Sequence, residues 1–268
     1  MFSRLGLCAR SNCSYIIYRN INYRSKARFK KPFLRNENQE FKIHKPKRTF
    51  PLFIDQHLKL APKVKSMPEQ KFDFFLVLDF EATCDSPVNV EPPEIIEFPV
   101  LKVNGNTFNI ESTFHSYVKP EINPELSSFC TELTGIIQGM IDDQPSFKVV
   151  FEKFLDWMKK ENLLMPDVKF AFVTCGDPDL DYLLPVQGQI SKFEVPDYMQ
   201  RWINIKRSFC EIEPYTWPDN LSKMLQYCEL EPQGELHSGL DDSKNVARVL
   251  KDLAERGLVF NFNGCKKT

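Results

Sequence analysis

Residues 76–85 read LVLDFEATCD and place two acids, Asp79 and Glu81, directly after a run of strand-forming apolar residues. Side chains alternate between the two faces of a strand, so acids separated by one residue point to the same face. Burying a carboxylate without a partner costs free energy, and two carboxylates on one face also repel each other. The fold must therefore bring compensating groups to the end of this strand.

Other apolar patterns indicate the architecture around this strand. Residues 72–82 and 168–177 contain continuous apolar runs, as in strands covered on both faces. The dipeptide Asn104-Gly105 separates two strand-like segments and predicts a hairpin with a two-residue type I′ turn. We therefore expect a sheet that has helices on both faces.

Apolar residues three and four apart predict a helix that begins at Phe147, with Ser146 as its cap. A second helix is expected after Asn220, and a last one from Gly239 to Arg256. Three strands followed by alternating helices and strands predict an α/β fold with a mixed sheet flanked by helices.

Charge divides the chain unevenly, although its formal net charge is only −1. Residues 1–50 contain 13 Lys and Arg against two acids, and the remainder contains 22 against 34. Residues 1–35 have the composition of a mitochondrial presequence, which predicts a mitochondrial location. Alternatively, they form a basic tail that contacts RNA or acts as a nuclear signal, and the protein is then located in the cytoplasm or nucleus. We expect a linker at 36–70, one folded domain at 71–262 and a tail at 263–268.

Cysteine spacing and hydropathy exclude several classes of protein. The eight cysteines form no CxxC pair, which argues against a zinc knuckle or a thioredoxin-like motif. No apolar run approaches the ~20 residues of a membrane-spanning helix, so no membrane partner is expected.

Further polar residues follow the other predicted elements. Asp179 follows the strand at 168–177, His237 lies in a loop, and Asp242 lies in the first turn of the last helix. Together with Asp79 and Glu81, Asp179 and Asp242 make four carboxylates. They can converge on one spot only if cations neutralise their charge, and Mg²⁺ and Mn²⁺ prefer such oxygen ligands. Two such ions can activate water against a phosphodiester, with a histidine as general base.

Each of these residues also has a simpler interpretation. Asp79 alone could cap a loop, Asp242 alone could complement the helix dipole, and His237 alone could be an ordinary loop histidine. The five residues together, in this order and at these positions, favour the catalytic interpretation.

Three sequence segments then resemble a known family: DFEATC, GDPDL and HSGLDDSKN are similar to the motifs of DEDDh 3′→5′ exonucleases of the DnaQ-like, RNase T superfamily. EIIEFPVL, FCTELTGIIQ and RWINIKRSF are similar to its enhanced-RNAi (Eri) and histone-mRNA exonuclease group. This resemblance spans roughly 190 residues and implies a ribonuclease-H-like fold with two Mg²⁺ ions.

Matched residue by residue, the resemblance implies that Asp79, Glu81, Asp179 and Asp242 hold the metals and that His237 is the general base. It implies hydrolysis of the 3′-terminal phosphodiester with release of 5′-nucleoside monophosphates. It also implies contacts between the substrate's 3′ end and a set of mostly apolar residues, each of which could equally belong to the core: Phe80, Ala82, Thr83, Phe129, Leu133, Thr134 and Ile137.

Three positions depart from the family pattern. Pro178 stands where the group usually has a tryptophan that would stack on the terminal base, an interaction worth ~1–3 kcal/mol. Asp177 lies two residues before Asp179 and could compete with it as a ligand, although the match favours Asp179. Ile137 replaces a usual threonine.

RNA is the expected substrate, as single strands or 3′ ends, with DNA as an alternative. Because the body is acidic, phosphate attraction must come from local cations such as Lys192, Arg201, Lys206 and Arg207. A catalytically weak nucleic-acid-binding protein is the alternative from another class, and the intact set of five residues argues against it.

Overall fold

The central strand of the molecule is β1 (Phe74–Leu78), the apolar run that precedes Asp79. The computed structural model describes residues 60–266, so the expected leader at 1–35 lies outside the described residues. Within the described range, seven strands form one mixed sheet in the order β2-β3-β1-β5-β6-β7, with β4 paired to β3. The other strands are β2 (Glu81–Ala82), β3 (Ile95–Asn104), β4 (Ile110–Tyr117), β5 (Phe170–Thr174), β6 (Arg201–Asn204) and β7 (Gly264–Cys265).

The sheet is parallel in its middle and antiparallel toward its edges. β1 runs parallel to β5, and β5 runs parallel to β6. β1 runs antiparallel to β3, and both β2 and β4 also pair antiparallel with β3. β1 therefore has hydrogen-bonded neighbours on both sides, which confirms the central strand expected from its sequence.

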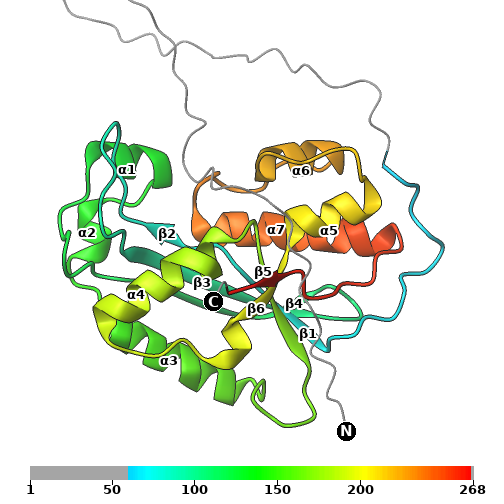
Figure 1. Cartoon of the computed structure of the whole chain (residues 1–268), viewed down its shortest axis with the longest axis horizontal. Coiled ribbons are helices and arrows are strands. Elements are labelled where there is room, and N and C mark those ends of the chain that lie inside the picture. Colours follow the sequence, from blue (N-terminus) through cyan, green and yellow to red (C-terminus); the bar gives the residue numbers. More distant parts are fainter. Residues whose placement is uncertain (1–59, 267–268) are drawn as a thin grey trace, which may run out of the picture. The chain divides into compact units, whose positions relative to one another are not determined.

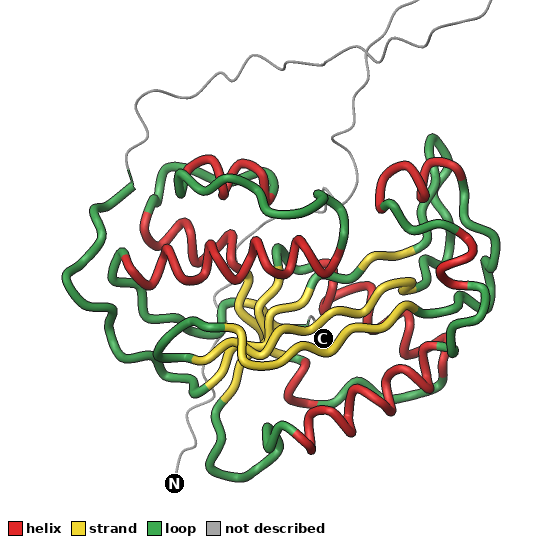
Figure 2. Tube along the Cα trace, turned by 180° about the vertical axis from the view of Figure 1, so that it is seen from behind, coloured by secondary structure: helices red, strands yellow, loops and turns green. Residues whose placement is uncertain are grey.

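Helices cover both faces of this sheet, as expected for a strand that is apolar on both sides (Figure 2). Figure 1 shows α5, α6 and α7 on one face and α3 and α4 on the other. The helices are α1 (Ser128–Thr134), α2 (Gln138–Ile141), α3 (Phe147–Lys160), α4 (Leu184–Ser191), α5 (Ile205–Ile212), α6 (Leu221–Tyr227) and α7 (Gly239–Glu255). A π-helical turn (Asp179–Leu183) and a short 3-10 helix (Asp197–Met199) complete the set.

Alternate residues of β1 supply the two cores. Phe75 and Val77 pack with α5, α6 and α7, whereas Leu76 and Leu78 pack with α3 and α4. All four side chains are fully buried, and each contributes roughly 1.5–3 kcal/mol of hydrophobic stabilisation. This packing makes β1 a rigid support for the two acids that follow it.

The expected hairpin between β3 and β4 is present, but the expected two-residue turn is wrong. Residues 105–109 connect the strands, and the Phe108 N–H donates to the Asn104 carbonyl. Asn104 Oδ1 also accepts from the N–H groups of Asn106 and Thr107, which stabilises a longer loop. A β-carbon at Gly105 would lie 2.0 Å from the Phe72 carbonyl oxygen, so close approach explains the glycine.

The helix expected from Phe147 is confirmed, and Ser146 occupies its N-cap position, but the Ser146 side chain makes no capping hydrogen bond. The helix after Asn220 is confirmed as α6, and here the Asn220 side chain accepts from the Lys223 N–H. The last helix is confirmed as α7, one residue shorter than expected.

The ordered structure continues on both sides of residues 71–262. Leu60 and Met67, in the expected linker, pack against the core formed with α7. Gly264 and Cys265, in the expected tail, form β7 and pair with β6. Among residues 60–266 no helix combines the length and apolar character needed to span a bilayer.

Candidate active site

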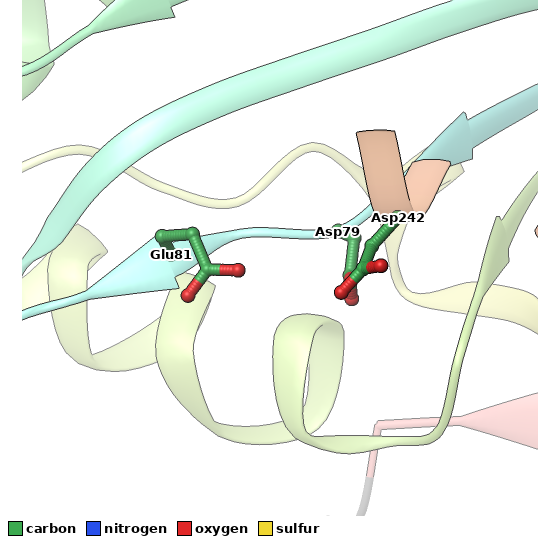
Figure 3. A group of neighbouring side chains, drawn as sticks. All are labelled: Asp79, Glu81 and Asp242. Carbon is green, nitrogen blue, oxygen red and sulfur yellow. The ribbon is translucent and has the colours of Figure 1, made fainter. Parts of the chain in front are cut away.

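Asp79 directly follows the last residue of β1, and Glu81 is the first residue of β2. Both side chains are partly buried, and Asp242 approaches them from the first turn of α7 (Figure 3). One carboxylate oxygen from each of the three residues lies within 4.8 Å of the other two. The sequence prediction that Asp79 and Glu81 share one face therefore matches this geometry.

Asp242 is held in place by the loop that precedes its helix. Its Oδ2 accepts a hydrogen bond of 2.9 Å from the backbone N–H of His237. Its Oδ1 is buried and has no hydrogen-bond partner among the described residues. A buried carboxylate oxygen without a donor is costly, so this atom fits a role as ligand to a cation.

Asp179 lies beside this group of three acids. It begins the π-helical turn after β5, directly behind Pro178, and its side chain is 7% exposed. Its Oδ1 accepts a hydrogen bond of 2.9 Å from the Phe80 N–H, which ties it to the segment between Asp79 and Glu81. The structure thus brings the four sequence-predicted acids to one region, with three of them in mutual contact range.

Burial and mutual repulsion shift the protonation of these acids. Burial, followed by the charges of Asp179 and Asp242, raises the pKa of Asp79 well above its usual value. Burial and then the charge of Asp79 do the same to the pKa of Glu81. Burial raises the pKa of Asp179 to about 6. The acids therefore favour either protons or a metal cation at neutral pH.

His237 lies in the exposed loop ahead of α7. Its backbone has a positive φ of 65°, a conformation uncommon for residues other than glycine. Its backbone N–H donates to Asp242 Oδ2, which places the residue beside that acid, whose pKa is raised by burial. An exposed histidine at this edge is accessible to water and to a substrate, as the sequence prediction requires.

Asp177, the alternative ligand, is committed to other partners. Its Oδ1 accepts hydrogen bonds of 3.0 Å from Trp202 Nε1 and from Asn204 Nδ2. Its Oδ2 forms an ion pair of 2.6 Å with Arg207. Asp177 therefore joins β6 and α5 to the end of β5 and stands outside the acid group.

The expected phosphate-attracting cations have different surroundings. Arg207 is paired with Asp177, and Arg201 lies 4.5 Å from the centre of the Phe262 ring. Lys192 ends α4 and is exposed. Lys206 Nζ donates to the Asp219 carbonyl at 2.6 Å, and its positive charge opposes in part the rise in the pKa of Asp79 that burial causes. Lys206 therefore lies within electrostatic range of Asp79.

Three of the expected substrate contacts are core or scaffold residues. Phe80 is 6% exposed and packs edge-to-face on Phe98 with ring centres 4.8 Å apart. Thr83 Oγ1 accepts from the Glu94 N–H, and Thr134 Oγ1 donates to the Cys130 carbonyl. Their side chains are buried, so any substrate contact there must use backbone atoms.

The remaining expected contacts are more open. Ile137, at the start of α2, is 54% exposed. Phe129 and Leu133 are partly buried and lie one turn apart on α1, so they share a face of that helix. Ala82 is also partly buried and packs against the core. Phe129, Leu133 and Ile137 therefore supply accessible apolar surface, and their contact with a substrate remains a prediction.

The sequence analysis missed Glu97, a fifth acid of this region. Glu97 lies on β3 directly opposite Glu81 and is 1% exposed. Its charge raises the pKa of Asp79, Glu81 and Asp242. Glu97 could have been predicted because it is an acid inside the apolar run EIIEFPVL, just as Asp79 is an acid at the end of an apolar strand.

A family model described as Exonuclease (RNase_T) matches residues 76–250, the segment that carries all of these acids. The chain belongs to this exonuclease family. Its fold is accordingly the ribonuclease-H-like α/β fold of DEDDh exonucleases, as the sequence resemblance implied. The matched segment runs from β1 into α7 and therefore includes both ends of the acid group.

Several exonucleases are similar to this chain. ERI1 exoribonuclease 3 of Homo sapiens is 53% identical over 196 residues, which cover 73% of this chain and 58% of that protein. The nuclease domain of 3′hExo, a DEDDh family member bound to rAMP, has a TM-score of 0.70 at 37% identity, with 74% of this chain and 100% of that chain covered.

A second solved structure concerns 3′-end specific recognition of a histone mRNA stem-loop by a 3′-exonuclease. It has a TM-score of 0.71 at 36% identity, with 74% of this chain and 69% of that chain covered. The similarity therefore extends over the whole of the solved nuclease domain, whereas this chain spans 58% of the length of ERI1 exoribonuclease 3.

Proposed function

We propose that this chain is a metal-dependent 3′→5′ exoribonuclease. The observation that carries the proposal is the meeting of Asp79, Glu81 and Asp242 within 4.8 Å, with Asp179 beside them, in a member of an exonuclease family. Burial raises the pKa of Asp79, and the buried Oδ1 of Asp242 has no hydrogen-bond partner among the described residues. Both features support a site in which a bound cation neutralises the acids.

Divalent ions of the Mg²⁺ class fit these residues, with Mn²⁺ able to replace Mg²⁺. Asp79, Glu81, Asp179 and Asp242 offer hard oxygen ligands and no sulfur or imidazole, which is the donor set that such ions prefer. Two bound ions would neutralise the clustered charge, orient the phosphodiester and acidify a water molecule. The rigid end of β1 and the start of α7 would keep the ligand atoms in register.

His237 would serve as the general base. In the proposed reaction its imidazole accepts a proton from water, and the water oxygen attacks the phosphorus of the 3′-terminal phosphodiester. The bond from phosphorus to the 3′ oxygen of the preceding nucleotide breaks, and that oxygen gains a proton from solvent. The products are a 5′-nucleoside monophosphate and an RNA shorter by one nucleotide.

RNA is favoured as the substrate by two similarities. A relative that is 53% identical is named an exoribonuclease, and one similar structure concerns a histone mRNA stem-loop. The accessible apolar residues Phe129, Leu133 and Ile137 suit stacking against a terminal base, which single-stranded ends expose. The alternatives are a DNA exonuclease with the same site and a nucleic-acid-binding protein of weak activity.

Three substrates of matched sequence would separate these alternatives. Single-stranded RNA, single-stranded DNA and a stem-loop RNA with a 3′ overhang, each labelled at the 5′ end, would be incubated with the full chain and Mg²⁺. We expect a ladder shortened from the 3′ end, formed faster from RNA because contacts to the 2′-hydroxyl distinguish it from DNA. Faster loss of DNA would support the first alternative, and binding without shortening would support the second.

We also propose that residues 1–35 direct the protein to mitochondria, a proposal supported by their nine Lys and Arg, four Ser and absence of acids. Residues 1–50 fused to a fluorescent protein should colocalise with a mitochondrial stain. A nuclear or diffuse cytoplasmic signal would contradict this.

A further inference from the structure

Glu97 connects three elements at the base of the acid group. Its side chain is 1% exposed on β3, and both of its oxygens have partners. Oε1 lies 2.8 Å from Nε2 of His115 on β4, and Oε2 accepts a hydrogen bond of 2.9 Å from the Gly239 N–H. Oε1 also accepts from the Leu240 N–H at 3.4 Å. Glu97 therefore binds the first two residues of α7.

This contact replaces the usual cap of the helix. The first N–H groups of an α-helix have no partner within the helix, and the N-cap side chain commonly satisfies one of them. Ser238 occupies the N-cap position of α7 but makes no such hydrogen bond. Glu97, which is 142 residues away from Gly239 in the chain, supplies the acceptor, and its charge also complements the helix dipole.

The start of α7 also lies directly against the end of β1. A β-carbon at Gly239 would lie 2.5 Å from the Asp79 carbonyl oxygen and 3.1 Å from Glu97 Oε2. Only glycine leaves room for the helix start at this distance. Because His237 precedes Gly239 by two residues and Asp242 follows it by three, the position of Gly239 sets the positions of both.

We propose that Glu97 is a positioning residue that docks the start of α7 and thereby places Asp242 and His237 against Asp79 and Glu81. His115 holds the Glu97 carboxylate from the opposite side. The proposal rests on the proposed exonuclease function. It requires no contact between Glu97 and the substrate or a metal, since both Glu97 oxygens are already engaged.

Two substitutions of Glu97 separate positioning from other roles. Glu97→Leu keeps a similar volume and removes both acceptors, whereas Glu97→Gln keeps one carbonyl oxygen for an α7 N–H. We expect kcat on RNA to fall about 100-fold in Glu97→Leu, because misplacement of catalytic groups by about 1 Å costs that much. Glu97→Gln should retain most of kcat, and KM for RNA should change by less than about threefold in both variants, as expected for an interaction that acts only on the chemical step.

Asp252→Asn provides the matched control. Asp252 is also a buried carboxylate of α7 (2% exposed), but it lies near the other end of the helix and pairs with Arg256 and Lys63. We expect this variant to be less stable and to keep the kcat of the unaltered chain. An equal loss of kcat in Asp252→Asn and Glu97→Leu would reduce the role of Glu97 to general stability and overturn the proposal.

A second measurement does not depend on activity. Hydrogen exchange of the Gly239 and Leu240 amides in the metal-free chain should accelerate in Glu97→Leu and stay unchanged in Asp252→Asn. If Glu97→Leu does not fold, the same measurements are made on His115→Gln. The His115 side chain is 28% exposed, and its substitution removes only the contact with Glu97 Oε1 on the side away from α7. His115→Gln should show a smaller loss of kcat and a smaller gain in exchange.

The outcomes that overturn the proposal are distinct. Unchanged exchange at Gly239 and Leu240 in every variant would show that Glu97 does not hold α7. A raised KM for RNA with unchanged kcat would make Glu97 a substrate contact, and loss of all Mg²⁺ binding in Glu97→Gln would make it a ligand. If the unaltered chain cleaves nothing, the proposed function fails, while the exchange data still test the docking role.

Discussion

At the scale of single residues, two aspartates separated by one position have opposite environments. Burial raises the pKa of Asp179 to about 6, and one backbone N–H from another segment, that of Phe80, donates to its carboxylate. Asp177 has an arginine and two side-chain donors. Burial disfavours the charged form of Asp179, whereas the carboxylate of Asp177 is fully engaged by neighbouring side chains, so we expect the two residues to have different functions.

Substitution of each aspartate by asparagine should reveal this difference. We expect Asp179→Asn to lose at least ~10³-fold in kcat, because a ligand for the catalytic cations is removed. Asp177→Asn should retain kcat within roughly tenfold but lose about 1–2 kcal/mol of unfolding free energy, because partners of a charged acceptor are left weakly paired. Urea titration and initial rates on RNA measure both; the reverse pattern would show that Asp177 is the ligand.

At the scale of elements, two glycines differ in how closely another segment of the backbone approaches them. Gly105 follows β3 at the end that pairs with the start of β1, away from Asp79. An added β-carbon at Gly105 would meet the Phe72 carbonyl oxygen at 2.0 Å, whereas one at Gly139 in α2 would meet nothing within 4 Å. The two glycines therefore provide a matched pair.

We expect Gly105→Ala to lower the unfolding free energy by about 1–3 kcal/mol, because the backbone must move to relieve overpacking. Gly139→Ala should leave stability unchanged or raise it by up to ~1 kcal/mol through helix propensity. Chemical denaturation compares both with the unaltered chain. Equal stability of the two variants would show that the β3–β4 connection is less tightly packed than described.

An element could be predicted from the sequence when neighbouring residues in the chain determine it. β1, α3 and α7 carry complete apolar patterns, and Asn220 caps α6 through its own side chain, so the sequence alone predicted them. The β3–β4 turn was predicted wrongly because contacts of Gly105 with residues 72 and 73 favour a longer loop over the local Asn-Gly preference.

The candidate site followed the same rule. The four acids and His237 lie in short motifs, and the structure brings them to one region. Glu97 was not predicted because its role depends on Gly239, a residue more than a hundred positions away. The separation of Asp177 from the site likewise depends on Trp202, Asn204 and Arg207, which no local pattern links to it.

At the scale of the whole molecule, the acid group couples stability to pH and to metal. A carboxyl whose pKa is higher in the folded chain than in the unfolded chain binds more protons when folded, so stability falls as pH rises between the two values. For Asp179 this window runs from 3.8 to about 6, and the raised pKa values of Asp79 and Glu81 act in the same direction. Asp179 alone corresponds to a loss of up to roughly 3 kcal/mol.

We therefore expect the Tm of the metal-free chain to fall between pH 4 and pH 6, and Mg²⁺ to raise it mainly above pH 6. Asp179→Asn should flatten this dependence, which separates the contribution of the acid group from that of other ionisable groups. Thermal scans with EDTA and with Mg²⁺ provide the measurement. A metal-free Tm that rises with pH, or that Mg²⁺ does not change, would contradict the coupling.

The most direct test of the central claim is the release of nucleoside monophosphate from a 3′-labelled single-stranded RNA by the full chain. We expect release with Mg²⁺, no release with EDTA, and recovery when Mg²⁺ is restored in excess. Asp79→Asn should reduce the rate by at least ~10³-fold at every Mg²⁺ concentration, because the first ligand of the site is lost. Release that persists in EDTA, or that survives in Asp79→Asn, would contradict a metal-dependent active site built on these acids.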